Sequence, residues 1–278
     1  MNLIEIFKSI ILGIVEGITE WLPISSTGHM ILVDQFLKLN MSEAFMEMFL
    51  VVIQLGAIMA VVVLYWKKLF PFSFGEKEII QKDTFIMWFK IIVSCIPAAI
   101  VGVLFDDEVD ALFYNPPTIA IMLILVGIIF IIVENRNKNK KATINSIADI
   151  TFKTAAIIGV FQLIAAVFPG TSRSGATIIG AMMIGVSRGI ATEFTFFLAV
   201  PVMFGASLLK VVKFGFAFTQ YETIILIAGL VSAFIVSIVS IKFLTGYIRK
   251  HDFKPFGWYR IVLGCVVLLF FLGKSMIG

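Results

Sequence analysis

The sequence predicts an all-α polytopic membrane protein. Hydrophobic residues make up 60% of the 278 positions and charged residues only 14%, which leaves too little polar surface to cover a water-soluble globule. Several apolar stretches also approach the roughly 20 residues that a helix needs to cross the hydrocarbon core. We expect spans at about 45–66, 86–105, 117–134, 191–210, 222–244 and 257–273, within one membrane domain over 1–278.

A shorter, interrupted segment precedes the first span. Residues 8–22 are apolar, Pro23 breaks the run, and a second short helix is expected from about Gly28 to Leu39. Each half is too short to cross the membrane. A helix, a polar break and another short helix are typical of a re-entrant hairpin, which is tolerated at membrane depth only inside protein or beside a wet cavity.

The same order of segments returns after a basic linker. Residues 153–168 are apolar, a break runs from Pro169 to Gly175, and a short segment continues to about Val186 before three further spans. We therefore predict repeat 1 at about 1–134, a linker at 135–152 and repeat 2 at about 153–278. Because each repeat crosses an odd number of times, the fold would be an inverted-topology repeat, each copy a re-entrant helix hairpin plus three transmembrane helices.

The two hairpins can be aligned without a gap. Two short apolar segments can match by chance, and the repeated number of spans is what favours a true repeat. The alignment pairs Glu16 with Gln162, Pro23 with Pro169, and Ser25-Ser26 with Thr171-Ser172.

Basic residues are distributed unequally between the two predicted sides. One side carries Lys67, Lys68, Lys77, Lys82, Lys90, Arg136, Lys138, Lys140, Lys141, Lys153, Lys242, Arg249, Lys250, Lys254 and Arg260. The other carries Lys8, Lys38, Lys210, Lys213, Lys274 and an acidic loop at 106–110. The positive-inside rule makes the first side cytoplasmic, with both termini and the entrance of the first hairpin outside. A full crossing by 8–39 would move the N-terminus, and loop charge does not decide this. Basic residues spread over loops do not indicate a nucleic-acid partner.

Two carboxylates lie four residues apart in the first hairpin. Glu16 and Glu20 would be neighbours on one helical face. At low dielectric they need a shared proton or a cation, and Mg²⁺ is held well by one or two carboxylates plus substrate phosphates. A divalent cation site for Mg²⁺ or Ca²⁺ is one interpretation, and a hydrogen-bonded structural pair is the other.

The break after these carboxylates is rich in hydroxyl groups. Ser25, Ser26 and Thr27 are placed to cap the next helix, which is the ordinary role of such residues. Free N–H groups at a helix N-terminus also suit an anion. His29, within one turn, is a candidate acid or base.

The second break contains a permanent cation. Arg173 is flanked by Gly170, Thr171, Ser172 and Ser174. A planar guanidinium at a glycine-rich helix start is typical of phosphate binding. The alternative is an ion pair with Glu16 or Glu20, and the two arrangements can alternate between bound and empty states.

Other polar side chains have simpler interpretations. Arg188 follows the second hairpin and is expected to snorkel to the membrane surface. Trp21, Trp66, Trp88 and Trp258 lie near predicted helix ends, as interfacial anchors do.

Two long motifs carry a family resemblance. Glu16-Gly-x-Thr-Glu20-x-Leu-Pro-x-Ser-Ser-Thr-Gly-His29 and Pro169-Gly-Thr-Ser-Arg-Ser-Gly175 resemble the undecaprenyl-diphosphatase family, which is linked to bacitracin resistance. The resemblance covers essentially the whole chain. It implies hydrolysis of undecaprenyl diphosphate to the monophosphate and phosphate, with a divalent cation and a site open to the periplasm or cell exterior. It also implies catalytic roles for Glu16, Glu20, Ser26, His29 and Arg173.

Several alternatives stay open at this stage. Ser26 could attack phosphorus with His29 as base, or His29 could activate water. Paired re-entrant hairpins also occur in transporters, so the competing function is a transporter or flippase for an anionic lipid phosphate. A lipid-binding scaffold without turnover is the weakest option. The expected partners are a polyprenyl diphosphate and membrane lipid, and a homodimer is left open because apolar surface does not distinguish a subunit contact from lipid.

Overall fold

The computed structural model describes residues 3–73 and 80–277, and Lys77 of the predicted cytoplasmic side lies outside them. The described residues form helices joined by loops and contain no β-strand. The all-α prediction is therefore confirmed for this part of the chain. The helices are α1 (Leu3–Thr19), α2 (Ser26–Phe36), α3 (Glu43–Leu64), α4 (Trp66–Leu69), α5 (Lys82–Leu104), α6 (Asp106–Phe113), α7 (Pro116–Asn137), α8 (Phe152–Val167), α9 (Arg173–Met183), α10 (Arg188–Phe214), α11 (Gln220–Tyr247) and α12 (Lys254–Ile277).

Six of these helices are long and apolar enough to cross a membrane. They are α3, α5, α7, α10, α11 and α12, each 22 to 28 residues long within the described chain. All six coincide with the predicted spans. Large apolar side chains also stand exposed along them, including Val103 and Leu269, as expected for helices that face lipid. The protein is thus a multi-pass membrane protein.

The two interrupted segments form two pairs of short helices. Helices α1 and α8 have 17 and 16 residues, and α2 and α9 have 11 each. The first short helix was predicted at 8–22 and lies earlier in the chain, because α1 runs from Leu3 to Thr19 and a turn covers residues 20–24. The second begins at Ser26 rather than Gly28, because Ser25 already caps it.

Each hairpin packs one helix closely against a long helix of the other half of the chain. Helix α1 lies on α11, and α8 lies on α5. A Cβ atom on Gly13 would lie 2.4 Å from the Gly229 carbonyl oxygen, and one on Gly159 would lie 2.6 Å from that of Ser94. Small residues permit this close approach, as is usual between membrane helices.

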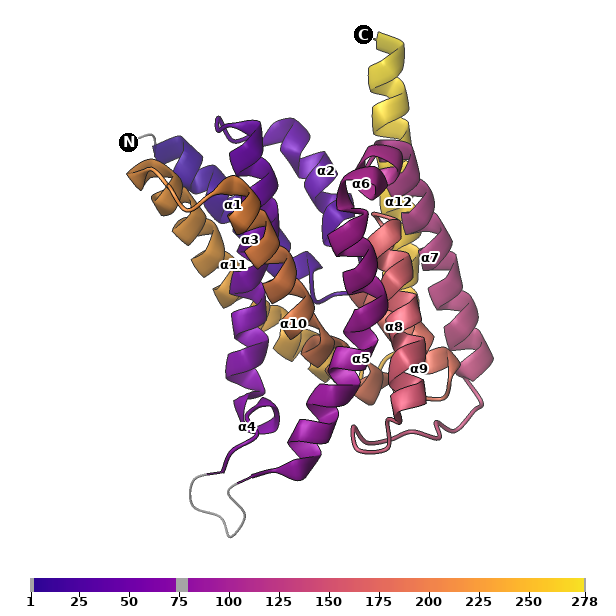
Figure 1. Ribbon diagram of the computed structural model, residues 1–278. Coiled ribbons are helices and arrows are strands. Elements are labelled where there is room, and N and C mark those ends of the chain that lie inside the picture. Colours follow the sequence, from indigo (N-terminus) through magenta and orange to yellow (C-terminus); the bar gives the residue numbers. More distant parts are fainter. Residues whose placement is uncertain (1–2, 74–79, 278) are drawn as a thin grey trace.

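The hairpins enter the bundle from opposite ends (Figure 1). Helix α1 begins and α12 ends at the same end, whereas the 138–151 connection that leads into α8 lies at the other. The inverted repeat and its boundaries stay predictions. What the structure adds is that the two breaks meet inside the bundle.

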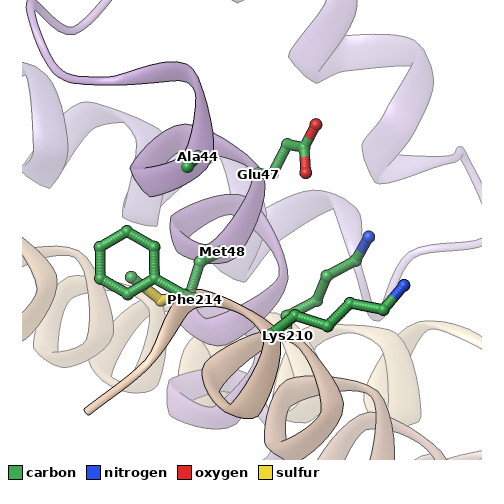
Figure 2. Close-up of a pocket in the computed structure, with 6 residues that line it drawn as sticks. Ala44, Glu47, Met48, Lys210 and Phe214 are labelled. Atoms are coloured by element: carbon green, nitrogen blue, oxygen red, sulfur yellow. The ribbon is translucent and has the colours of Figure 1, made fainter.

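The acidic stretch predicted as a loop is a helix. Four acidic residues fall in α6, three of them in its first turn, where negative charge stabilises a helix. Lys210 and Lys213 of α10 pair with Asp106 at 3.3 Å each. A charged surface pocket lies beside these lysines, with Glu47 of α3 and Lys210 on the same side of it (Figure 2). None of its lining residues belongs to the predicted site.

Candidate active site

The two breaks have the same backbone geometry. Ser25 has a φ of 73° and its hydroxyl accepts a hydrogen bond from the Gly28 amide at 3.3 Å. Ser172 has a φ of 69° and accepts from the Gly175 amide at 3.2 Å. Positive φ is uncommon for serine and is often found at functional sites.

This geometry corrects the gapless alignment. Ser25 is equivalent to Ser172 and not to Thr171, because these two serines share both the conformation and the capping contact. Counted from the proline, the capping serine therefore comes one residue later in the second break than in the first. Gly170 makes the extra turn possible: its φ is 91°, and a Cβ there would lie 2.5 Å from the Ile119 carbonyl oxygen.

Glu20 joins the two hairpins. Its Oε1 accepts a hydrogen bond from Arg173 Nη2 at 2.8 Å, and its Oε2 accepts one from Ser26 Oγ at 2.9 Å. Its backbone carbonyl accepts one from Ser174 Oγ at 3.1 Å. The ion pair considered as an alternative role for Arg173 is thus present in this state. It brings the carboxylate, the hydroxyl and the guanidinium to one point.

Arg173 is held from several directions. Besides Glu20, its Nη1 donates to the Thr195 carbonyl at 3.0 Å, and its guanidinium carbon lies 5.9 Å from the centre of the Trp21 ring. Trp21 is fully buried and meets Phe196 edge to face. Its prediction as an interfacial anchor was wrong, because it packs beneath the guanidinium.

Buried polar atoms without a partner gather around the breaks. In the described chain they are Glu16 Oε1, Trp21 Nε1, Gln162 Oε1, Thr171 Oγ1, Arg173 Nε and Arg260 Nε. Leaving such a group unpaired costs about 1–3 kcal/mol, so each one calls for an explanation. The three N–H groups and the Thr171 hydroxyl could serve an anion, and the Glu16 oxygen could serve a cation.

His29 does not hydrogen-bond to Ser26, as it would have to in order to act as the base that takes the Ser26 proton. Its Nδ1 lies 2.7 Å from the Ser25 carbonyl oxygen and its Nε2 lies 2.7 Å from the Tyr259 hydroxyl. The Ser26 hydroxyl donates to Glu20 instead. Thr27 is half-buried in the first turn of α2, next to these groups.

The second break supplies further contacts around Arg173. The hydroxyls of Ser172 and Ser174 lie 3.1 Å apart. The carbonyls of Gly170 and Thr171 both accept from Arg260 Nη2 at 2.9 Å. All the predicted residues of this break thus lie at the meeting point of the hairpins.

Arg260 belongs to the site although it was predicted as a cytoplasmic loop charge. It is fully buried in α12, and its Nη1 also donates to the Pro23 carbonyl at 3.3 Å. It therefore ties both breaks to the last helix. The missed signal was its place inside the span predicted at 257–273, since a charge within a span indicates a functional site.

Arg188, in contrast, has a structural partner. Its Nε donates to both oxygens of Glu134 at 2.9 and 3.1 Å, and Glu134 also accepts from the Phe253 amide. The Glu134 side chain has no exposed surface. The snorkelling prediction was wrong, because this arginine neutralises a buried carboxylate between α7 and α10.

The carboxylates fit a divalent cation only with help from a ligand. In the described chain no group of three or more His, Cys, Asp or Glu residues is arranged to hold a metal. Glu16 is 1% exposed and offers one unpaired oxygen, one turn away from Glu20. Two carboxylates completed by phosphate oxygens are a typical Mg²⁺ arrangement.

Comparison with known proteins identifies the family of this chain. Residues 9–266 match the family model described as bacitracin resistance protein BacA. The chain is 67% identical to the undecaprenyl-diphosphatase of Desulfitobacterium hafniense over 278 residues, all of both chains. It is 66% identical to undecaprenyl-diphosphatase 1 of Clostridium acetobutylicum, over 98% of this chain and 99% of that one. It is 65% identical to an undecaprenyl-diphosphatase of Enterococcus faecalis, over 97% and 98%. The chain therefore belongs to the bacitracin resistance protein BacA family.

Proposed function

We propose that the meeting point of the two breaks is where this protein hydrolyses undecaprenyl diphosphate to undecaprenyl phosphate and phosphate. This activity recycles the lipid carrier of cell-wall synthesis and accounts for the link to bacitracin resistance. One observation supports this location above all: the Glu20 carboxylate accepts hydrogen bonds from Ser26 of its own hairpin and from Arg173 of the other hairpin. A nucleophile, a base and a phosphate-binding cation are thereby adjacent.

Arg173 and the starts of α2 and α9 would bind the diphosphate. The guanidinium would exchange Glu20 for phosphate oxygens, and its buried, unpaired Nε would gain a partner. The first amides of the two helices add donors. Cleavage of a phosphoanhydride depends mainly on in-line positioning and on neutralising charge on the equatorial oxygens.

Glu20 is better placed than His29 to take the proton of Ser26. As Ser26 Oγ attacks the terminal phosphorus, its proton would pass to Glu20 Oε2, which already accepts it at 2.9 Å. The bridging P–O bond breaks and undecaprenyl phosphate leaves. Water then hydrolyses the phosphoserine to free phosphate and regenerates the serine. Direct attack by a water held at Glu20 stays the alternative.

Glu16 and Glu20 would hold a Mg²⁺ or Ca²⁺ ion against the bound phosphates. The cation would supply the charge neutralisation that two buried carboxylates and a diphosphate require. The unpaired Oε1 of Glu16 supports this assignment.

We also place the entrance of the first hairpin, the active site and both termini on the periplasmic or extracellular side, as loop charge suggests. A homodimer stays a prediction.

The test is phosphate release from undecaprenyl diphosphate by purified protein in detergent, with and without chelator. Ser26→Ala and Arg173→Ala should each lose activity about 100-fold or more, and His29→Ala should lose less, because another group takes the proton. Ser207→Ala is the matched control, since this buried serine in α10 donates to Val51 far from the breaks. Absence of release from folded wild type would favour the transporter instead.

A further inference from the structure

We propose that Tyr259 is a positioning residue that acts on Ser26 through His29. The inference rests on the proposed function of the first hairpin. The Tyr259 hydroxyl lies 2.7 Å from His29 Nε2, and the two rings are nearly parallel, 9° apart, with centres separated by 5.6 Å. Both the hydrogen bond and the stacking connect α12 to α2.

The partners of His29 define its tautomer. The Ser25 carbonyl can only accept a hydrogen bond, so Nδ1 of His29 carries a proton and donates it. In a neutral imidazole Nε2 is then an acceptor, and the Tyr259 hydroxyl donates to it. Both ring nitrogens are therefore occupied, which fixes the orientation of the ring.

This chain of contacts ends at the strained residue of the break. Ser25 holds a φ of 73°, and Ser26 follows it directly. Fixing the Ser25 carbonyl therefore fixes the direction in which the Ser26 hydroxyl leaves the backbone. Tyr259, through His29, would keep that hydroxyl on Glu20. Tyr259 is 47% exposed and therefore lies outside the buried core.

The chain contains a matched pair for comparison. Of its two histidines, the second, His251, stacks on Tyr247 with ring centres 4.5 Å apart. This pair lies where α11 ends, outside the two breaks. Tyr247→Phe is therefore a control for loss of a tyrosine hydroxyl beside a stacked histidine.

The first experiment measures the contact without measuring catalysis. Diethyl pyrocarbonate modifies unprotonated imidazole nitrogens, and mass spectrometry can follow each histidine separately. Tyr259→Phe should raise the modification rate of His29 severalfold and leave that of His251 unchanged. Tyr247→Phe should leave the His29 rate at the wild-type value. An unchanged His29 rate in Tyr259→Phe would overturn the proposal, whatever the activity of the protein.

The second experiment is a double-mutant cycle on phosphate release. Tyr259→Phe should lower kcat about five- to tenfold, as loss of one hydrogen bond predicts, with KM within about twofold. In the His29→Ala background the same substitution should have no further effect. An equal loss in both backgrounds, or a loss that follows thermal stability alone, would overturn the proposal. Absence of release from wild type would defeat the proposed function, while the labelling result would still test the contact.

Discussion

The two hairpins share one backbone geometry and carry opposite chemistry. Helices α2 and α9 have 11 residues each, and each begins directly after a serine with positive φ. The hydroxyl of that serine accepts a hydrogen bond from the backbone amide three residues later. The residue after the cap differs: it is Ser26 in one hairpin and Arg173 in the other. The first hairpin supplies carboxylates and a hydroxyl, and the second supplies a cation. Two hairpins with similar backbones can thus each supply different groups to one proposed site, which forms only where the two breaks meet.

The division has an electrostatic reason. Glu20 is 7% exposed, and a buried carboxylate requires a partner of opposite charge. Its own hairpin offers a hydroxyl and no cation between residues 16 and 29. The partner therefore comes from the other break, and the diphosphate would separate the two charges by taking the place of Glu20 on Arg173.

The largest effect should follow loss of the carboxylate that joins the hairpins. Glu20→Gln should lower kcat about 100- to 10,000-fold, because it removes the proposed base and one cation ligand. Phosphate release under saturating substrate measures this. Glu43→Gln, an exposed glutamate in the first turn of α3, should retain full activity. Wild-type activity in Glu20→Gln would show that the two hairpins contact each other at Glu20 without this carboxylate taking part in the reaction.

An ion pair outside the hairpins should matter for stability rather than for rate. Arg188→Met should lower the free energy of unfolding by about 3–5 kcal/mol, because it leaves Glu134 buried without a counter-charge. The double variant Glu134→Gln with Arg188→Met should recover part of this loss. Unfolding in detergent measures both, while kcat of the folded fraction should stay at the wild-type value. A drop in kcat without unfolding would instead place this pair in the catalytic machinery.

Equivalent positions of α1 and α8 should differ in their effect on the cation. Glu16→Gln should raise the Mg²⁺ concentration for half-maximal activity about tenfold or more, because ligand charge sets the affinity for such cations. Gln162→Glu should leave that concentration unchanged, since Gln162 donates to the Ser94 carbonyl of α5 at 3.3 Å and has no hydrogen bond to either carboxylate. A Mg²⁺ titration of phosphate release gives both values. An equal response in the two variants would contradict a cation site confined to the first hairpin.

Replacing either capping serine should give the smallest effect, a similar loss of stability in both breaks. Ser25→Ala and Ser172→Ala should each cost about 1 kcal/mol of stability, because each removes a helix cap. Ser25→Gly and Ser172→Gly should cost less, since glycine adopts positive φ without strain. Thermal unfolding in detergent measures all four variants. A large difference between the two breaks would show that their similar geometry hides different packing.

Local properties of the sequence determined much of this protein. Span length, hydrophobicity and the two polar breaks predicted six crossing helices and two short pairs, because these features depend on neighbouring residues. The same breaks also predicted Glu20, Ser26 and Arg173 as candidate site residues.

Only the tertiary structure decided how these groups meet. Glu20 bonds to Arg173 across 153 positions, and His29 bonds to Tyr259 across 230, so no local pattern could rank these partners above others. Arg260 was assigned to a loop, and Trp21 to the membrane interface, although both are fully buried. Their place depends on which helix faces reach the two breaks, and packing between distant segments sets those faces.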